Sequence, residues 1–407
     1  MTARSCEGIS PIDSPAASIG AKIGRMSDQA PGEVSRPTRH TRFVRAGAIY
    51  LLVVAVVGIA TGSRPNNLVI WLFSALIAAL LVSGLISGLM MLPIRALRLE
   101  PRRGRVGEPL LVRYEVSNRA RFMPAFDISV AERVDATRLE PIGAAWILHA
   151  GPRDTVHAEA VFRPLRRGLV ALERFEVTST FPFGLIRKIL RFRQPAQILI
   201  HPEVVPLRPD LLASVATGSL GGQRLSGEAG GSDDFFGVRE YQPGDSIRHI
   251  AWKRLAGTGK LATVERGRVV PPRIRVLLDL RRPTAALRTA PDEDARALEE
   301  RAIVLAASMV ALADRLGYEY GLSVAGIAIP AVGLRRGHFH REKIMSLLAA
   351  IDLDAPRLAG NGLAASDERA TLLSVHPDRT DTAVAPKSAW HFTARQLDSL
   401  REKAEAP

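Results

Sequence analysis

The chain has 407 residues, enough for about two or three domains, and 47% of them are apolar. The formal net charge of +14 would suit an anionic membrane surface or a nucleic acid, but the arginines are spread widely, so we expect a membrane surface and no nucleic acid. The only cysteine, Cys6, excludes an intramolecular disulfide and a cysteine metal cluster.

Residues 1–42 are rich in Ser, Pro, Gly and Ala and lack an apolar period, so we expect a disordered leader. No signal-peptide cleavage site follows the first apolar run. Within residues 43–93, Ala46–Gly62 has about 17 uncharged residues and Leu68–Leu92 has about 25, which predicts a transmembrane helical hairpin in a lipid bilayer. Two buried helices of a soluble core are the alternative.

The flanking charges predict the orientation of this hairpin. The connecting turn holds only Arg64, whereas both outer flanks are rich in arginine. The positive-inside rule therefore places both termini in the cytoplasm, with two helices crossing the inner cell membrane. The flanking cations are Arg36, Arg39, Arg42 and Arg45 before the hairpin, and Arg95, Arg98, Arg102, Arg103 and Arg105 after it.

From residue 94 to 210 the apolar period changes to two, which indicates short strands and predicts a small antiparallel β-sandwich without a catalytic constellation. His157 lies on one strand and is interpreted as a structural histidine. The segment Phe181–Leu185 (FPFGL) is interpreted as a packing corner, with a binding epitope as the alternative. The predicted strands are Leu110–Val116, Phe126–Val130, Val156–Phe162, Phe175–Thr178 and Ile198–Ile200.

Residues 211–231 form a glycine-rich stretch that predicts a linker. The later phrase Gly257–Lys260 (GTGK) superficially resembles a phosphate-binding loop. However, Arg254 stands where the first glycine of that motif belongs, and Leu261 stands where a Ser or Thr belongs. We therefore reject nucleotide binding here and expect no cofactor.

Residues 232–270 concentrate charges of both signs with aromatic residues. Gln242–Asp245 (QPGD) predicts a type II turn, because Pro and Gly occupy its two central positions. We expect the Asp245 carboxylate to bind backbone amides and to face a cation among Arg239, Arg248 and Lys253. Ile250, Trp252 and Leu255 are expected to pack inward.

Two catalytic or metal alternatives arise in the same stretch. Ser246, His249 and Asp245 match the residue types of a hydrolytic triad, but they crowd into one turn with no oxyanion element, so we reject that interpretation. A divalent-ion site at Asp233 and Asp234 is the second alternative, although adjacent carboxylates in a glycine-rich loop are more often solvated.

Residues 271–360 predict an α/β domain. Arg273–Leu280 is a compact buried strand, Asp292–Gly317 carries an apolar stripe at helical spacing, and Tyr320–Ile329 is a second strand. A further helix is expected at His338–Ile351. This order predicts a partly parallel sheet. Residues 361–407 are expected to form a tail with a strand at Thr371–Val375 and a charged helix at Thr393–Ala404.

The segment Arg239–Asp245 (REYQPGD), with Arg248, Ile250, Trp252, Lys253 and Ala256, resembles the signature of the bacterial family called domain of unknown function 58. Phe181–Leu185 and Leu277–Asp279 match flanking features of that family, so the resemblance covers roughly residues 45–355. It implies a multi-domain fold: the membrane hairpin, the β-sandwich and a von Willebrand factor A-like domain. The signature or interaction residues are Arg239, Glu240, Tyr241, Pro243, Gly244, Asp245, Arg248, Trp252 and Lys253.

The metal site of such a domain needs Asp-x-Ser-x-Ser after its first strand, so that a carboxylate and two hydroxyls bind Mg²⁺. Here Asp279 is followed by Arg281 and Pro283 at the two serine positions. We therefore expect a degenerate site without metal, in which Asp279 pairs with an arginine.

The resemblance implies a membrane-anchored, cytoplasm-facing adaptor or scaffold that is not an enzyme. Its implied partner is a MoxR-type AAA+ ATPase, in the assembly or maturation of other proteins or in envelope processes. The alternative is a membrane-tethered hydrolase that uses Asp233, Asp234, Asp245 or His249.

Overall fold

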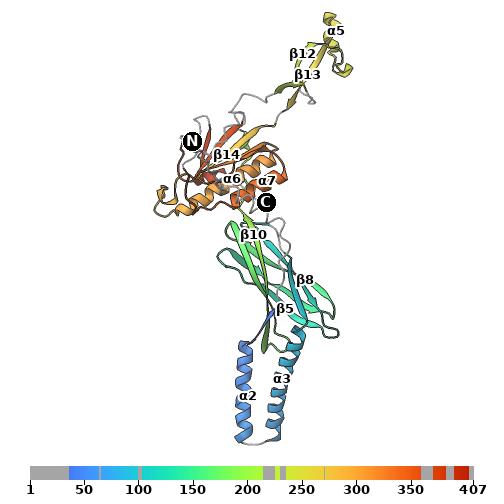
Figure 1. Ribbon diagram of the computed structural model, residues 1–407, viewed down its shortest axis with the longest axis vertical. Helices are drawn as coiled ribbons and strands as arrows, with labels where there is room; N and C mark the ends of the chain where they lie inside the picture. The colour runs from blue at the N-terminus through green and yellow to red at the C-terminus, as the bar shows by residue number, and fades with distance from the viewer. Residues whose placement is uncertain are drawn as a thin grey trace, which may run out of the picture. The chain divides into compact units, whose positions relative to one another are not determined.

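The structure, a computed structural model, describes residues 36–63, 66–99, 103–213, 225–229, 235–269, 271–358, 370–381 and 389–402. The chain divides into two compact units, one formed mainly by residues up to Glu203 and the other mainly by residues from Val204 onward (Figure 1). Each unit is described by itself.

Two long apolar helices begin the first unit: α2 (Arg45–Ser63) and α3 (Asn67–Met91). Both are long and apolar enough to cross a membrane, and most of their apolar side chains are exposed. That exposure distinguishes them from the core helices of a soluble domain. The Asn66 side chain caps α3 by accepting a hydrogen bond from the Leu68 amide at 3.0 Å. Arg64 and Pro65, in the turn, lie outside the described residues.

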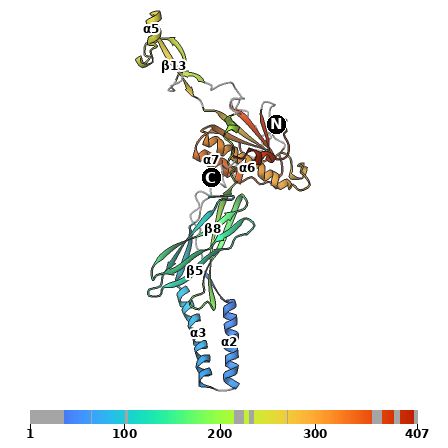
Figure 2. The same ribbon diagram turned by 180° about the vertical axis from the view of Figure 1, so that it is seen from behind.

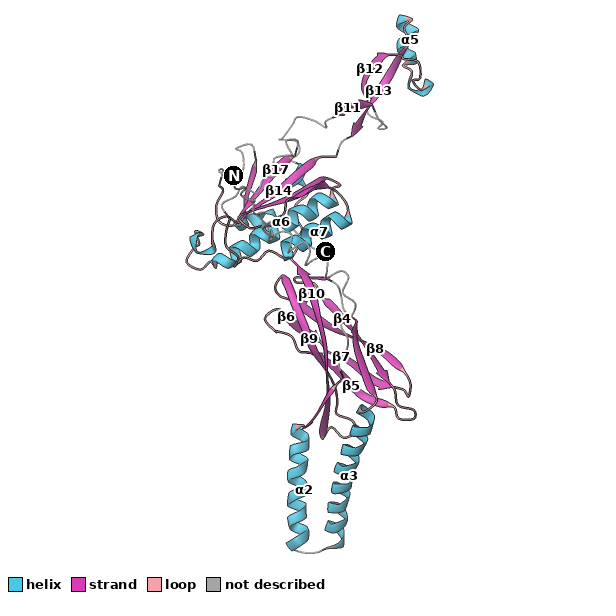
Figure 3. Ribbon diagram, in the orientation of Figure 1, coloured by secondary structure: helices cyan, strands magenta, loops and turns pink. Residues whose placement is uncertain are grey.

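The predicted antiparallel β-strands are confirmed, and they form two sheets that share one hydrophobic core (Figure 3). The four-stranded sheet has the order β2 (Ile94–Leu99), β4 (Leu110–Asn118), β8 (Thr155–Pro164) and β6 (Leu139–Gly143). The six-stranded sheet has the order β1 (Thr38–Phe43), β10 (Ile186–His201), β9 (Gly168–Ser179), β5 (Ala125–Glu132) and β7 (Ala145–Ala150), with β3 (Arg103–Arg105) paired to β10.

A buried ion pair joins these two sheets through the core. Arg98 extends from β2, and its Nη1 atom lies 2.7 Å from Glu132 Oε1 on β5; both side chains are fully buried. The Tyr114 hydroxyl donates to the same carboxylate at 2.9 Å. Gln194 accepts from the Arg98 amide at 2.9 Å and donates to the Arg98 carbonyl oxygen at 3.0 Å. A charge of this kind is stable inside a core only with such partners.

The second unit contains a five-stranded sheet in the order β16 (Val332–Arg335), β15 (Glu319–Ala325), β14 (Arg273–Asp279), β17 (Thr371–His376) and β18 (Trp390–Thr393). All neighbouring pairs are parallel except β15 with β16. The unit also contains α6 (Ala295–Arg315), the first part of α7 (His338–Ala349), the short α8 (Leu397–Leu400) and the 3-10 turns η2 (Thr284–Ala286) and η3 (Ala394–Gln396).

A separate three-stranded sheet, which we call the signature arm, has the order β11 (Leu225–Ala229), β13 (Ala262–Val269) and β12 (Phe235–Glu240) (Figure 3). The chain between β12 and β13 forms η1 (Ile247–His249) and α5 (Trp252–Thr258). Most of the predicted signature residues lie in this connection.

Several predicted boundaries are wrong. Thr38–Phe43, mostly assigned to a disordered leader, pair as β1 with β10, because their extended backbone supplies an edge to the sheet. Leu212, assigned to the linker, is fully buried. The predicted tail supplies β17 and β18 to the α/β sheet, so that unit does not end at residue 360. The expected helix Thr393–Ala404 is only η3 followed by α8 within the described residues.

Candidate functional site

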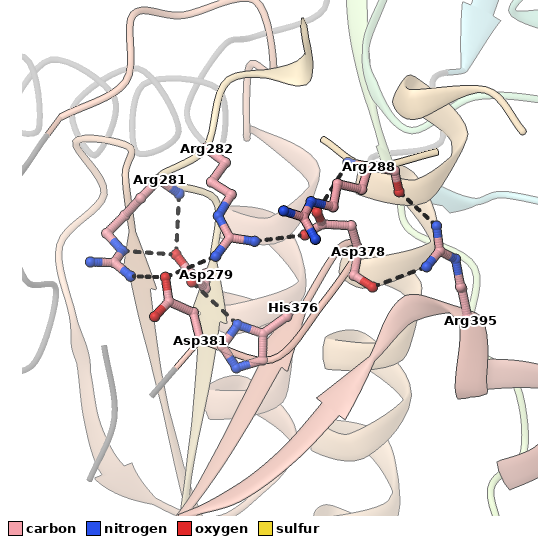
Figure 4. A network of polar contacts seen from close by, with 8 residues as sticks. All are labelled: Asp279, Arg281, Arg282, Arg288, His376, Asp378, Asp381 and Arg395. Carbon is pink, nitrogen blue, oxygen red and sulfur yellow. Dashed lines mark hydrogen bonds and ion pairs between the residues drawn. The ribbon is translucent and has the colours of Figure 1, made fainter. Parts of the chain in front are cut away.

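The carboxyl ends of β14 and β17 bring a polar cluster together at one edge of the α/β sheet (Figure 4). Asp279 is the last residue of β14, and His376 is the last residue of β17. Because the two strands are parallel neighbours, their ends lie side by side. We call this group the carboxyl-edge cluster; it contains Asp279, Arg281, Arg282, Arg288, His376, Asp378, Asp381 and Arg395.

Asp279 is buried, and both of its carboxylate oxygens have hydrogen-bond partners. Its Oδ1 atom accepts from the Arg281 amide at 3.2 Å and from Arg281 Nε at 3.1 Å, and its Oδ2 atom lies 3.2 Å from His376 Nδ1. Burial by itself raises the pKa of Asp279, but the hydrogen bonds from His376 and Arg281 outweigh burial, so the pKa is lowered overall. The predicted pairing of Asp279 with an arginine is confirmed.

Arginines also hold the two other carboxylates of the cluster. Asp381 Oδ2 lies 3.1 Å from Arg281 Nη2 and 3.0 Å from Arg282 Nη2. Asp378 Oδ1 lies 3.1 Å from Arg282 Nη1, and its Oδ2 atom accepts from the Arg288 amide at 3.1 Å. The two neighbouring arginines thus supply fixed positive charge to three carboxylates.

This charge arrangement disfavours a divalent cation. Arg281, two residues after Asp279, contacts the Asp279 oxygen directly. A guanidinium that close to the carboxylate competes with a cation for the same oxygen and repels it. Among the described residues, no group of three or more His, Cys, Asp or Glu side chains is placed to hold a metal ion.

His376 links Asp279 to two further polar side chains. Its Nε2 atom lies 2.9 Å from the Ser374 hydroxyl and 3.1 Å from Nδ1 of His391 on β18. The Asp–His–Ser order resembles a hydrolytic relay, but Ser374 is fully buried, which denies a substrate access to its hydroxyl. His376 was not identified from the sequence as part of a site. Its position directly after the predicted strand Thr371–Val375 could have indicated it.

In the signature arm, Asp245 fixes the turn after β12. Its Oδ1 atom lies 2.6 Å from Arg239 Nη2, and its Oδ2 atom accepts from the Gln242 amide and the Thr263 hydroxyl, both at 3.0 Å. The Asp245 amide donates to the Gln242 carbonyl oxygen at 3.0 Å, and Gly244 has a φ of 112°, as the predicted turn requires. The expected roles of Asp245 and its cation are confirmed.

These bonds make the turn sensitive to acid. The hydrogen bonds from Arg239 and from the Gln242 amide lower the pKa of Asp245 to about 2. A depressed folded-state pKa gives stability that is complete above the unfolded value of about 3.9 and is lost as the pH falls through the folded value. We expect amide hydrogen exchange across residues 239–263 to accelerate between about pH 4 and 2 in the full-length protein, relative to intrinsic rates. Asp245→Asn should remove that dependence; an identical pH dependence in this variant would contradict the assignment.

The prediction that Trp252 packs inward is wrong. Trp252 begins α5 with 57% of its surface exposed, and Ile247 in η1 is also exposed. Ile250 and Leu255 are only half-buried. Of residues 238–264, only Ala262 and Thr263 are buried. The connection therefore has no hydrophobic core against which Trp252 can pack.

The remaining predicted residues surround this turn and helix. Glu240 ends β12, and the Tyr241 amide donates to the Leu261 carbonyl oxygen at 3.2 Å. The exposed side chains on the connection include Pro243, Arg248 and Lys253. Asp245 is engaged by Arg239 and Thr263 and serves the turn, so the rejected triad gains no support from its contacts. Asp233 and Asp234 lie outside the described residues.

No family model matches the chain, and no curated protein matches it. Among solved structures, E. coli α-2-macroglobulin is 16% identical over 27% of this chain with a TM-score of 0.20, and Salmonella α-2-macroglobulin reacted with methylamine is 17% identical over 28% with a TM-score of 0.21. The CARDB domain of a Pyrococcus furiosus protein is 11% identical over 26% of this chain and 94% of that domain, with a TM-score of 0.18. The chain spans only 7% and 8% of the two macroglobulin chains, and similarities this weak assign it no function.

Proposed function

We propose that this chain is a membrane-anchored adaptor whose signature arm binds a protein partner. The two exposed apolar helices support the anchor. The arginines that flank them support an inner-membrane hairpin with both termini in the cytoplasm. On this proposal, the β-sandwich and the α/β unit both lie on the cytoplasmic side.

We further propose that the α/β unit is a von Willebrand factor A-like domain with a degenerate metal site. The sheet order β16-β15-β14-β17-β18, with one antiparallel strand, supports this assignment. So does the position of Asp279 at the carboxyl end of β14, followed by Arg281 where the metal-binding motif has serine. The domain then works as a rigid, metal-independent scaffold.

The observation that carries the adaptor proposal is Trp252, which is exposed at the start of α5, in the same connection as the turn that Asp245 holds in place. A large exposed aromatic side chain adds little to the stability of the fold. On a fixed backbone, however, it is the kind of residue that contributes most to the binding energy of protein interfaces. Four exposed cations accompany it on the same connection, and the nearest exposed carboxylate is that of Glu240, at the end of β12. These cations are Arg248, Lys253, Arg254 and Lys260. A partner with an apolar pocket and an acidic rim suits this surface, and the family resemblance names a MoxR-type AAA+ ATPase as the first candidate.

Co-purification tests this function. Full-length protein extracted in mild detergent is expected to retain a coexpressed MoxR-type ATPase, and Trp252→Ala should weaken that binding by about 30-fold, the effect of losing one hot spot of about 2 kcal/mol. Trp146→Ala is the matched control, because Trp146 has the same 57% exposure but lies on β7 of the sandwich. Thermal unfolding should be unchanged in Trp252→Ala and at most slightly lowered in Trp146→Ala, which also loses an exposed hydrogen bond from its indole to Asp127 at 3.1 Å. Failure to recover the ATPase with wild-type protein, or equal losses in the two variants, would count against the proposal.

A further inference from the structure

We propose that the end of the β-sandwich next to the two long helices is a membrane-docking surface, which inserts phenylalanines into the lipid interface and presents arginines to the phosphate groups. This inference rests on the membrane anchoring proposed above. It concerns a part of the chain that the signature arm does not include. We call this surface the membrane collar.

Backbone contacts fix the collar to the helix ends. The Val44 amide, just before α2, donates to the Leu185 carbonyl oxygen at 3.2 Å, and the Arg119 amide donates to the carbonyl oxygen of Pro93, just after α3, at 3.3 Å. A Cβ atom at Gly47 would lie 2.1 Å from the Leu185 oxygen, so only glycine permits this approach. The loops around Arg119 and Leu185 therefore sit where the helices leave the proposed bilayer.

The length of α3 supports the placement of the collar at the membrane surface. Its 25 residues extend about 37 Å, about 7 Å more than a hydrocarbon core of about 30 Å. The surplus corresponds to about the last five residues of the helix, where Ser87, Met90 and Met91 are buried against protein. Ile186, at the start of β10, lies within 3.6 Å of the Cβ position of Gly84. In Figures 1 and 2 this end of β10 lies beside the ends of α2 and α3.

Two loops of the collar expose aromatic side chains that the core does not use. Phe181 packs on Phe126 with a centroid distance of 4.9 Å, which supports the packing-corner interpretation. Phe183, two residues later, is 56% exposed, and Phe122 in the other loop is 81% exposed. Exposed phenylalanines on a soluble surface are costly, whereas phenylalanine is one of the residues that insert their apolar side chains at the lipid interface.

Exposed arginines accompany these phenylalanines. The Arg121 guanidinium stacks over the Phe122 ring at 5.2 Å, which gives the loop an apolar tip with a cationic base. Phe43, at the end of β1, is also exposed next to Arg42. This pairing of aromatic and cationic groups suits the boundary between acyl chains and phosphates. The exposed arginines of the collar are Arg42, Arg45, Arg95, Arg119, Arg121 and Arg187.

Site-directed spin labelling of the full-length protein tests the collar. In a Cys6→Ser background, which removes the only native cysteine, Phe122→Cys and Phe183→Cys would each carry a spin label in nanodiscs of phosphatidylcholine and phosphatidylglycerol. Leu165→Cys is the control in water, because Leu165 is exposed beyond β8 at the opposite end of the sandwich. Val53→Cys, exposed midway along α2, is the control in lipid. Accessibility to oxygen relative to a water-soluble nickel complex reports the depth of each label.

Labels at 122 and 183 are expected to give an oxygen-to-nickel ratio clearly above that at 165 and below that at 53. If the ratio at 53 is high and the ratios at 122 and 183 equal that at 165, the collar is overturned while the membrane anchor stands. If 53 is as accessible to nickel as 165, the anchor fails and the collar fails with it. Because both phenylalanines are exposed, these substitutions leave the sandwich core intact.

Discussion

Replacing Glu132 with alanine is expected to destabilise the protein by about 3–5 kcal/mol, because it leaves the Arg98 charge inside the sandwich without its carboxylate. The Tyr114 hydroxyl loses its acceptor in the same step. For a unit of this size, the loss corresponds to a fall in Tm of roughly 10 °C, measured on the detergent-solubilised full-length protein.

Glu159→Ala is the matched control for this substitution. It breaks a glutamate–arginine pair on the same sandwich, but the pair with Arg113 is exposed, so the cost should stay below about 1 kcal/mol. The triple variant Arg98→Met, Glu132→Leu and Tyr114→Phe should regain most of the loss, since apolar residues of similar volume need no partner and no buried hydroxyl is left without its acceptor. A Tm for Glu132→Ala equal to that of Glu159→Ala would show that the buried pair does not hold the two sheets together.

The second large effect is expected for Asp279→Ala, which should lower the free energy of unfolding by roughly 2–4 kcal/mol. The substitution removes a buried carboxylate that is hydrogen-bonded to Arg281 and His376. Asp398→Ala is its control: that carboxylate also pairs with an arginine, Arg301, but it is exposed, so its loss should cost less than about 1 kcal/mol. Chemical denaturation monitored on the α/β unit of the intact protein measures both.

The stability of the α/β unit is expected to depend on pH through Asp279. Since the folded-state pKa of Asp279 is lowered, its contribution is complete above the unfolded value of about 3.9 and is lost as the pH falls further. Asp279→Asn should therefore lose less stability than wild type between about pH 4 and 3. Parallel stability curves for the two proteins would indicate that Asp279 carries no net charge interaction in the folded state.

Local sequence patterns located most elements of the chain. Uninterrupted apolar runs identified α2 and α3, since each run is long and apolar enough for a helix that could cross a membrane. Alternation of period two identified the sandwich strands, and the apolar stripe of α6 gave its limits within a few residues. The turn at Gln242–Asp245 was also predictable, because Pro and Gly dictate its backbone angles.

Partners far apart in the chain were not predictable in this way. No local sequence pattern predicts that Thr38–Phe43 pairs with β10, because an edge strand depends on the strand beside it in the fold. Arg98 was counted as a flanking cation of the hairpin, yet it is fully buried against Glu132 on the opposite sheet. Its role depends on a pairing between strands that no short pattern encodes.

For this protein, the sequence by itself determined the helical hairpin, the change to β-strands, the Asp245 turn and the expectation that Asp279 faces an arginine, because each depends on residues within a few positions of one another. Only the tertiary structure decided that β17 brings His376 to Asp279 and that Trp252 faces solvent. It also decided that Phe122 and Phe183 lie in loops next to the helix ends. Burial and long-range contact depend on how the whole chain packs, and periodicity does not record that.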